Sequence, residues 1–488
     1  MNADSLIVLA LAVPLAGAGL IALTGRNPNL RETVTIVTSL ALFATVIGVA
    51  VAVFSGANPR TASLELFTVV ELGFSVEPLG MIFALVASGL WIVNSIYSIG
   101  YMRGNNEPRQ TSFYVCFAIA IAGAIGVAFA GNLFTLFLFY EILTLSTYPL
   151  VVHKANAEAV SAGRIYLLML LGTSMGLLLP AIVWTGVVAG TLDFMPGGIL
   201  QGKLGGTALG LLLALFVFGI GKAALMPMHF WLPAAMVAPT PVSALLHAVA
   251  VVKAGVFVVL KVIIYIFGIE FLATTGAGDW LLYVAGFTVI TASLIALRQD
   301  NLKRRLAYST VSQLAYVVLG AAILTPISVM GAALHILAHA VSKITLFFAA
   351  GSIATAANLT QVSQLNGIGR RMPWTMSAFA IGALSMIGVP PTVGFVGKWF
   401  ILSGAMTSQN WIAVAIIVIS TMLNAAYFLP IVFNAFFRAP DNPGGKDHEH
   451  GEAPWPMVLA LTATAIGTLA LFFFPDVPFT LAAMLVAR

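Results

Sequence analysis

Apolar runs of about 20 residues recur along the whole sequence, and their length limits the possible folds. A helix of that length crosses the ~30 Å hydrocarbon core of a bilayer. The 488 residues are 60% hydrophobic and 8% charged, which is outside the range of soluble globular domains. A transmembrane β-barrel would show alternating ten-residue strands instead of continuous apolar runs. The sequence therefore predicts an all-α polytopic membrane protein.

The runs predict about fourteen spanning helices in a single membrane domain over residues 1–488. The opening segment has no positively charged n-region, so we interpret it as the first spanning helix and not as a secretory signal. The expected spans are 4–24, 33–54, 77–101, 112–130, 132–152, 162–190, 205–237, 241–268, 277–297, 302–324, 326–356, 373–407, 409–437 and 454–474.

Positive charges are distributed unequally between the two sets of connecting loops. Odd-numbered connections carry Arg26, Arg31, Arg103, Arg109, Lys154, Arg164, Arg298, Lys303, Arg304, Arg305, Arg370, Arg371, Arg438 and Lys446. The opposite side carries only Arg60, Lys203 and Arg488. The positive-inside rule then puts both termini on the outer side of a bacterial cytoplasmic membrane. This bias accounts for most of the net charge of +5 and indicates no nucleic-acid partner.

The remaining five cations are all lysines inside expected spans, and one acid, Glu141, accompanies them. These lysines are Lys222, Lys253, Lys261, Lys343 and Lys398. A charged side chain at a helix centre costs roughly 2.5–3.5 kcal/mol, so such groups are retained for function. Lysine can lose its proton when desolvated, whereas arginine stays charged. For Lys261, near the outer end of its helix, snorkelling to the interface is an equally good interpretation.

Histidines extend the pattern. His335, His339 and Lys343 recur at intervals of four residues and form one stripe on a helix. Their spacing suits a proton relay, because histidine titrates near neutral pH, and it also suits a packing stripe. A metal pair is possible by spacing alone, but no carboxylate or cysteine accompanies it, so we predict no metal. Cys116 is the only cysteine, which excludes intrachain disulfides and cysteine-ligated centres.

Two spans are expected to be broken beside a lysine. Pro227 interrupts the span that carries Lys222, and Pro390 and Pro391 interrupt the span that carries Lys398. A carbonyl freed by proline is tolerated at membrane depth only where protein or water satisfies it. Paired interruptions of this kind are typical of internally repeated transporters.

Four ordered motifs resemble one family, the antiporter-like subunits of Mrp-type cation/proton antiporters, respiratory complex I and membrane-bound hydrogenases. The motifs are GKAALMPMHFWLPAAMVAPTPVSALLHAVAVVKAG (221–255), NLKRRLAYSTVSQLAY (301–316), HILAHAVSKITLFFAAG (335–351) and GVPPTVGFVGKW (388–399). The resemblance implies two inverted five-helix repeats, at about 112–268 and 277–437, each with a broken helix. Helices 1–3 (4–101) and the last helix (454–474) flank them.

The resemblance also implies a proton relay along the bilayer midplane. It places the relay on Glu141, Lys222, Lys253, His339 and Lys398, with His229, His247, His335 and Lys343 in support. Within the family the chain resembles most the D-type antiporter-like polypeptide of Mrp complexes. That implies a proton-translocating subunit of a Na+ (monovalent cation)/H+ antiporter with other membrane subunits as partners.

Other functions stay open on the sequence alone. A complex I subunit, a hydrogenase subunit or an inorganic-carbon uptake partner are alternatives within the family. A stand-alone solute symporter would need a polar substrate pocket at the midplane, and a structural scaffold would tolerate neutral replacement of the lysines. We recognise no nucleotide, flavin or quinone site, so we expect no cofactor and no enzymatic activity of the chain by itself.

Overall fold

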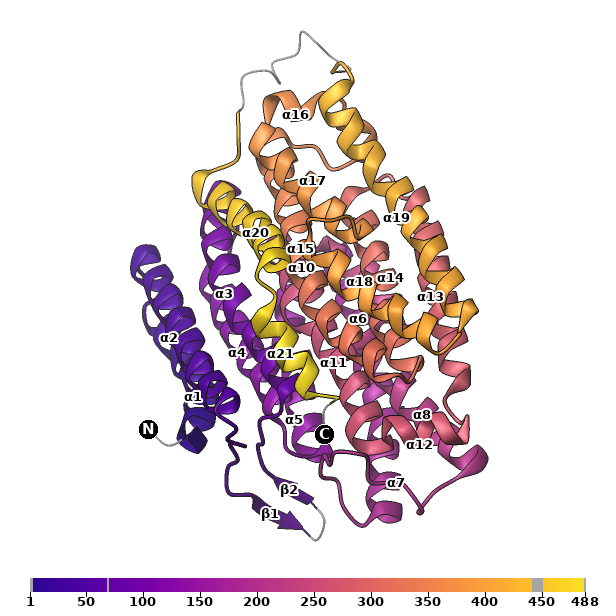
Figure 1. Ribbon diagram of the computed structural model, residues 1–488. Helices are drawn as coiled ribbons and strands as arrows, with labels where there is room; N and C mark the ends of the chain where they lie inside the picture. Colours follow the sequence, from indigo (N-terminus) through magenta and orange to yellow (C-terminus); the bar gives the residue numbers. More distant parts are fainter. Residues whose placement is uncertain (1–2, 68–69, 441–450, 487–488) are drawn as a thin grey trace.

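A computed structural model describes residues 3–67, 70–440 and 451–486, and Figure 1 shows them as one elongated bundle of helices. Lys446 and Arg488, counted above among the loop charges, lie outside the described residues. The helices are α1 (Ala3–Leu23), α2 (Pro28–Phe54), α3 (Pro78–Gly104), α4 (Gln110–Phe129), α5 (Leu133–Val151), α6 (Ala157–Thr173), α7 (Leu179–Ala189), α8 (Gly206–Gly219), α9 (Trp231–Ala234), α10 (Thr240–Ala244), α11 (Val251–Val262), α12 (Ile269–Thr275), α13 (Asp279–Arg298), α14 (Leu302–Ala322), α15 (Pro326–Ala357), α16 (Ile368–Arg371), α17 (Pro373–Ile387), α18 (Val393–Thr407), α19 (Trp411–Phe437), α20 (Trp455–Phe473) and α21 (Asp476–Met484).

The expected all-α polytopic fold is confirmed. Eleven helical spans in the described residues are long and apolar enough to cross a membrane. Two of these spans join labelled helices through π-helical turns, namely α6 to α7 and α10 to α11. Adding α14 and the two interrupted spans α8–α9 and α17–α18 gives the expected fourteen crossings. The arrangement as two inverted repeats stays a prediction.

Both expected interruptions are present. After α8 ends at Gly219, the chain makes a single 3₁₀ turn at Gly221–Ala223 and resumes as a helix only at Trp231. After α17 ends at Ile387, Gly388 adopts a φ of +92°, and α18 starts at Val393. Glycine suits this left-handed position because it has no Cβ.

The long helix α15 forms the centre of the bundle. Its 32 residues begin at a capping box, in which Thr325 and Ser328 satisfy each other's backbone N–H groups. It packs against α14, α17 and α18 on one side and against α3, α10 and α20 on others. Because protein surrounds α15, polar groups on it are shielded from lipid.

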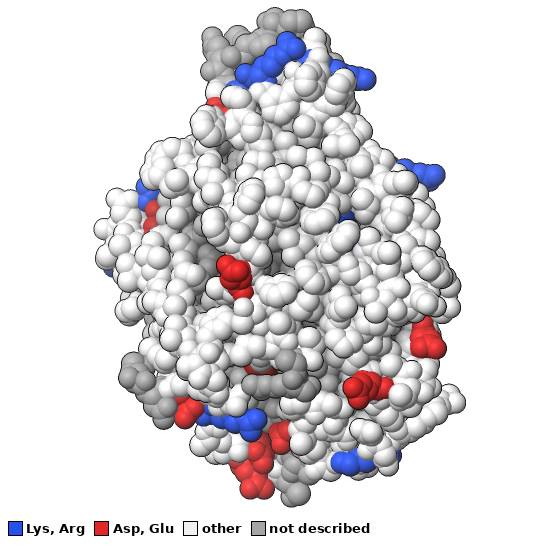
Figure 2. Space-filling view, in the orientation of Figure 1, with Lys and Arg blue, Asp and Glu red and all other residues white. Residues whose placement is uncertain are grey.

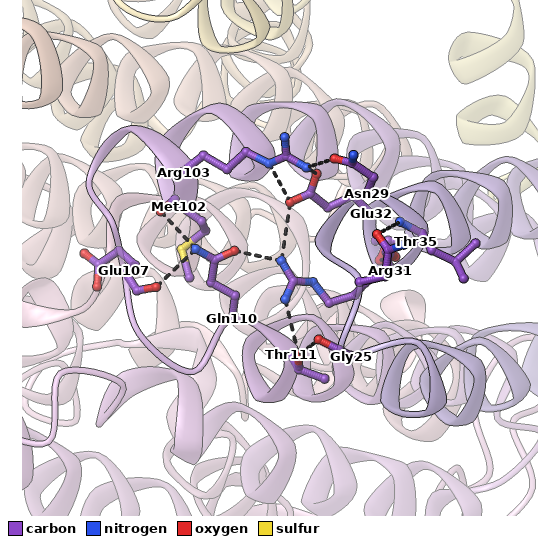
Figure 3. A network of polar contacts seen from close by, with 12 residues as sticks. Gly25, Asn29, Arg31, Glu32, Thr35, Met102, Arg103, Glu107, Gln110 and Thr111 are labelled. Carbon is purple, nitrogen blue, oxygen red and sulfur yellow. Dashed lines mark hydrogen bonds and ion pairs between the residues drawn. The ribbon is translucent and has the colours of Figure 1, made fainter.

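A polar clamp joins α2, α3 and α4 at one end of the bundle (Figure 3). Arg31, in the first turn of α2, donates to Gln110 Oε1 at 2.7 Å and to Thr111 Oγ1 at 3.2 Å. Glu32 beside it pairs with Arg103 near the end of α3. Both α2 residues are buried, whereas the sequence had placed Arg31 in a loop and the start of this helix at residue 33. Their charges satisfy one another, and this allows the helix to begin five residues earlier.

The opposite end carries elements that the sequence did not predict. Strands β1 (Leu64–Phe67) and β2 (Val70–Leu72) form a short antiparallel hairpin below the bundle in Figure 1. Helices α12 and α21 add short segments to the bundle. Figure 2 shows most charged side chains toward the two ends of this face, and the surface between them is largely uncharged except for an acidic side chain near the middle. This is the surface expected of a protein surrounded by lipid.

Candidate functional site: a buried row of lysines and histidines

All five lysines expected in the membrane are buried. Four have no exposed surface and Lys398 has 6%, while the single acid among them, Glu141, has 8%. Lys253 and Lys261 share α11, and the others come from separate elements: Glu141 from α5, Lys222 from the first interruption, Lys343 from α15 and Lys398 from α18. Long-range packing therefore assembles the row.

Neutral groups hold the ammonium group of Lys222. Its Nζ donates to the carbonyl oxygen of Tyr140 at 2.9 Å and to Thr144 Oγ1 at 2.6 Å, and it lies 3.1 Å from the centre of the Tyr140 ring. Glu141 follows Tyr140, whose carbonyl oxygen accepts from Lys222, and therefore lies on the same turn of α5 as this acceptor. Both Glu141 carboxylate oxygens lack a hydrogen-bond partner among the described residues. The expected partners are therefore neighbours but do not form a direct ion pair.

A glycine brings the first interruption against α11. A Cβ atom on Gly255 would lie 2.3 Å from the carbonyl carbon of Lys222 and 2.3 Å from the amide nitrogen of Ala223. Only glycine permits this approach of two backbones. Gly255 is two residues beyond Lys253, so the contact ties the positions of Lys222 and Lys253 together.

Lys253 contacts His339 directly across α11 and α15. Its Nζ lies against His339 Nδ1, and neither side chain is exposed. One turn earlier on α15, the ring of His335 lies with its centroid 6.4 Å from that of His339. The His335 Nε2 atom is 3.0 Å from Gln313 Oε1 on α14. The stripe expected on this helix therefore faces α11 and α14, inside the protein.

Lys398 satisfies the second interruption. Its Nζ donates to the carbonyl oxygens of Met386 at 2.7 Å and Ile387 at 3.1 Å, the last two residues of α17. A helix that stops leaves its final carbonyls without intrahelical partners. The lysine supplies donors to these groups. The neighbouring Gly397 packs against His335, since a Cβ there would lie 2.9 Å from the His335 Cα atom.

Two of the supporting residues lie beside this row. Lys343 donates to Ser309 Oγ at 2.5 Å, and the ring of His247 lies 4.7 Å from that of Phe347. The charges of Lys253 and Lys343 both act on His247. His229 is placed differently: its ring contacts are to Phe230 and Tyr308, with centroids 4.2 and 6.3 Å away. The structure gives His229 no contact with the lysines of the row.

Lys261 does not snorkel. It is fully buried, its Nζ is 2.5 Å from Glu77 Oε1, and it donates to the carbonyl oxygen of Ala130 at 2.8 Å. The sequence analysis missed Glu77 as a partner. Its position directly before Pro78 marks a helix start, and nothing in the sequence places it beside a residue 184 positions away.

The fold and the site together define a class of protein: a multi-pass membrane protein with a row of ionisable side chains buried through its centre. Within it, the chain belongs to the NADH:quinone oxidoreductase/Mrp antiporter membrane family, whose sequence pattern matches residues 130–424.

Individual relatives come from more than one kind of complex. The N polypeptide of the NADH-quinone oxidoreductase of Desulforudis audaxviator is 32% identical over 422 residues, covering 82% of each chain. The D polypeptide of the Na(+)/H(+) antiporter of Alkalihalophilus pseudofirmus is 26% identical over 446 residues, covering 89% of this chain and 87% of the relative. The Mrp complex of Dietzia sp. contains a chain of the same fold, with a TM-score of 0.88 and 22% identity over 100% of this chain and 97% of that one.

Proposed function

We propose that this chain is the proton-translocating subunit of a multisubunit Na+ (monovalent cation)/H+ antiporter. The observation that carries the proposal is the row itself: Lys222 is tied through Gly255 to the helix of Lys253, Lys253 contacts His339, and His335 links His339 to the segment of Lys398. Lysines with separate structural roles would not need to be connected through glycines and histidines in this way.

The surroundings of the lysines suit proton carriage. Neutral oxygen acceptors hold the ammonium groups of Lys222 and Lys398, so neither lysine has to break a direct ion pair when it gives up a proton. The negative charge of Glu141 favours the protonated form of Lys222, so a change at Glu141 shifts the proton toward Lys253. The Lys253–His339 contact needs a donor on one nitrogen and an acceptor on the other, so the pair holds the proton between them. Lys398 would then pass it to an exit.

The same proposal includes the partners and the location of the chain. It would be one subunit of a complex in a bacterial cytoplasmic membrane, with both termini on the outer side. Relatives are named as subunits, which supports other membrane subunits as partners. The bias of fourteen positive charges against three supports the orientation.

A second candidate is a proton-pumping membrane subunit of a respiratory complex I. The 32% identity to the N polypeptide of an NADH-quinone oxidoreductase, over 82% of both chains, favours it. The two candidates share the relay and differ in the partner chains. Purification of the native complex separates them, since flavin and iron–sulfur subunits would accompany a complex I member and only small membrane subunits an antiporter.

The decisive experiment is proton transport in everted membrane vesicles with the complete complex. Glu141→Gln and Lys222→Ala should each abolish cation-dependent proton movement while the subunit remains assembled. Lys203→Ala serves as the control, because this exposed loop lysine lies outside the row. Normal transport in either row variant, at normal abundance, would refute the relay.

A further inference from the structure

The ion pair of Lys261 and Glu77 lies outside the row just described. Lys261 stands on the same helix as Lys253, eight residues farther along, which is about 12 Å along the helix axis. Phe257 lies midway at helical spacing, and its ring centre is 5.4 Å from Lys261 Nζ. Phe257 is one helical turn from each lysine, and the ring of Phe194 also faces Lys261, with its centre 4.2 Å from Nζ.

A cavity of about 480 Å³ adjoins Glu77 of this pair, next to Arg60 and Ser75, which lie on either side of the β1–β2 hairpin in the sequence. Its lining includes Glu77 together with polar residues from separate segments, among them Arg60, Ser75, Gln201, Glu270 and Thr274. A cavity of this size and polarity accommodates on the order of ten or more water molecules. The side chain of Glu77 keeps 13% of its surface exposed, whereas Lys261 keeps none. Glu77 therefore stands between the cavity and the buried lysine.

We propose that this cavity is an outer water access to the row, and that Glu77 and Lys261 form the proton-exchange station at its base. This inference rests on the proposed function, and the species exchanged is the proton. The station works in two balanced steps. The Lys261 ammonium gives a proton to the Glu77 carboxylate, leaving a neutral amine and a neutral acid, and Glu77 then releases that proton to water in the cavity.

The neutral Lys261 regains a proton from the side of Lys253, and this restores the ion pair with the emptied Glu77 carboxylate. After a completed cycle Lys261 is again protonated and Glu77 is again ionised, so the net charge of the pair is unchanged. The 2.5 Å separation of Nζ and Oε1 brings donor and acceptor within the distance that the first step needs, although Glu77 Oε1 makes no hydrogen bond of good geometry in this structure, so a small rotation of either side chain must precede the transfer. Movement of the Phe257 ring would open the connection to Lys253.

Chemical labelling tests the access. In a Cys116→Ser background, Glu77→Cys in the complete complex is exposed to a small, membrane-impermeant cationic thiosulfonate in right-side-out and everted vesicles. We expect reaction from the outer side only. Glu65→Cys, on the exposed strand β1, reports the orientation of this end independently. Absence of reaction at position 77, or reaction only from the inner side, would overturn the access.

Transport tests the station. Glu77→Gln and Lys261→Met should each lower proton transport at least tenfold, and the double variant should remain inactive although it contains no unpaired charge. Recovery of transport in the double variant would show that the pair only stabilises the fold. Normal transport in both single variants, with Lys222→Ala inactive, would overturn this inference and leave the proposed function intact. Transport in Lys222→Ala would refute the function itself.

Discussion

Lys253 on α11 and His339 on α15 touch through Nζ and Nδ1, and neither side chain has exposed surface. Two cations in direct contact without water would repel strongly. The pair therefore holds one positive charge at most, and the contact couples the protonation of the two residues. A proton that arrives at one of them is shared with the other, which links the two halves of the row.

The hydroxyl group of Thr144 should tune Lys222. Thr144→Val removes one of the two hydrogen bonds to Nζ, and a hydrogen bond to a charged group contributes about 1.5–3 kcal/mol. We expect proton transport in everted vesicles to fall on the order of tenfold at unchanged abundance. Thr147→Val is the matched control on the same helix, because that hydroxyl lies 2.6 Å from Tyr166 OH instead. An equal loss in both variants would mean that helix packing, and not Lys222, is affected.

Lys398 should have separable structural and proton-carrying roles. Lys398→Leu leaves the Ile387 carbonyl without its side-chain donor and the Met386 carbonyl with only the 3.4 Å bond from Asn424 Nδ2, at about 1–3 kcal/mol for an unsatisfied group, so the subunit should be less abundant and inactive. Lys398→Arg keeps donors at this position but cannot release its proton. We expect near-normal abundance with transport strongly reduced. Immunoblotting and vesicle assays on the same membranes measure both, and full transport with arginine would remove Lys398 from the relay.

Gly255→Ala should separate the first interruption from α11. The added Cβ would meet the backbone of Lys222 and Ala223 at 2.3 Å, so one of the two segments must move. We predict a loss of transport of tenfold or more together with lower thermal stability in detergent. Gly172→Ala on α6 is the control, since a Cβ there has no neighbour within 4 Å. A Gly255 variant that behaves like the Gly172 variant would contradict the tight contact.

Acidification should destabilise the loop that follows α5, because His153 in this loop becomes protonated. Burial lowers the pKa of His153, and the charges of Arg109 and Lys154 lower it further, while a hydrogen bond to the Pro108 carbonyl opposes the shift. The folded pKa lies below the unfolded value near 6.5. The stabilising contribution is therefore present above pH 6.5 and is lost as pH falls through the folded pKa, with a slope of at most about 1.4 kcal/mol per pH unit.

His153→Phe removes this proton-binding site and keeps a ring against Phe113, whose centroid is 6.0 Å from that of His153. Melting temperatures of the detergent-solubilised complex between pH 5 and 8 should fall less on acidification in the variant than in the unchanged protein. Parallel pH profiles would show that His153 does not titrate in this range. At pH 8 His153 is neutral, so a difference in melting temperature between the variant and the unchanged protein at this pH measures the effect of the substitution on packing alone.

The sequence predicted what hydrophobicity and charge determine locally, and missed what depends on partners. It predicted both interruptions and the burial of Lys222, Lys253, Lys343 and Lys398, because a proline or a charge in an apolar run is visible without knowing the neighbours. It left Lys261 undecided, because its partner Glu77 and its acceptor at Ala130 come from other parts of the chain. It placed Arg31 in a loop for the same reason.

The sequence also left the order of contacts within the row undetermined. The spacing of His335 and His339 put them on one helix face but did not show that Lys253 meets His339 and Gln313 meets His335. His229 shows the opposite case, since the family resemblance implied a supporting role in the relay, whereas its ring contacts in the structure are to Phe230 and Tyr308. Helical periodicity defines faces, and only packing defines neighbours.

The clamp of Figure 3 has a consequence for how the chain enters the membrane during synthesis. Arg31 and Glu32 open the second spanning helix, yet Arg103, Gln110 and Thr111, which neutralise or bind them, are made 71 to 80 residues later. Until the ribosome has supplied α3 and the start of α4, α2 carries charges that lipid does not solvate. We therefore expect its first turn to stay at the water interface until then, and the first four helices to pack together only after α4 has begun to enter the membrane.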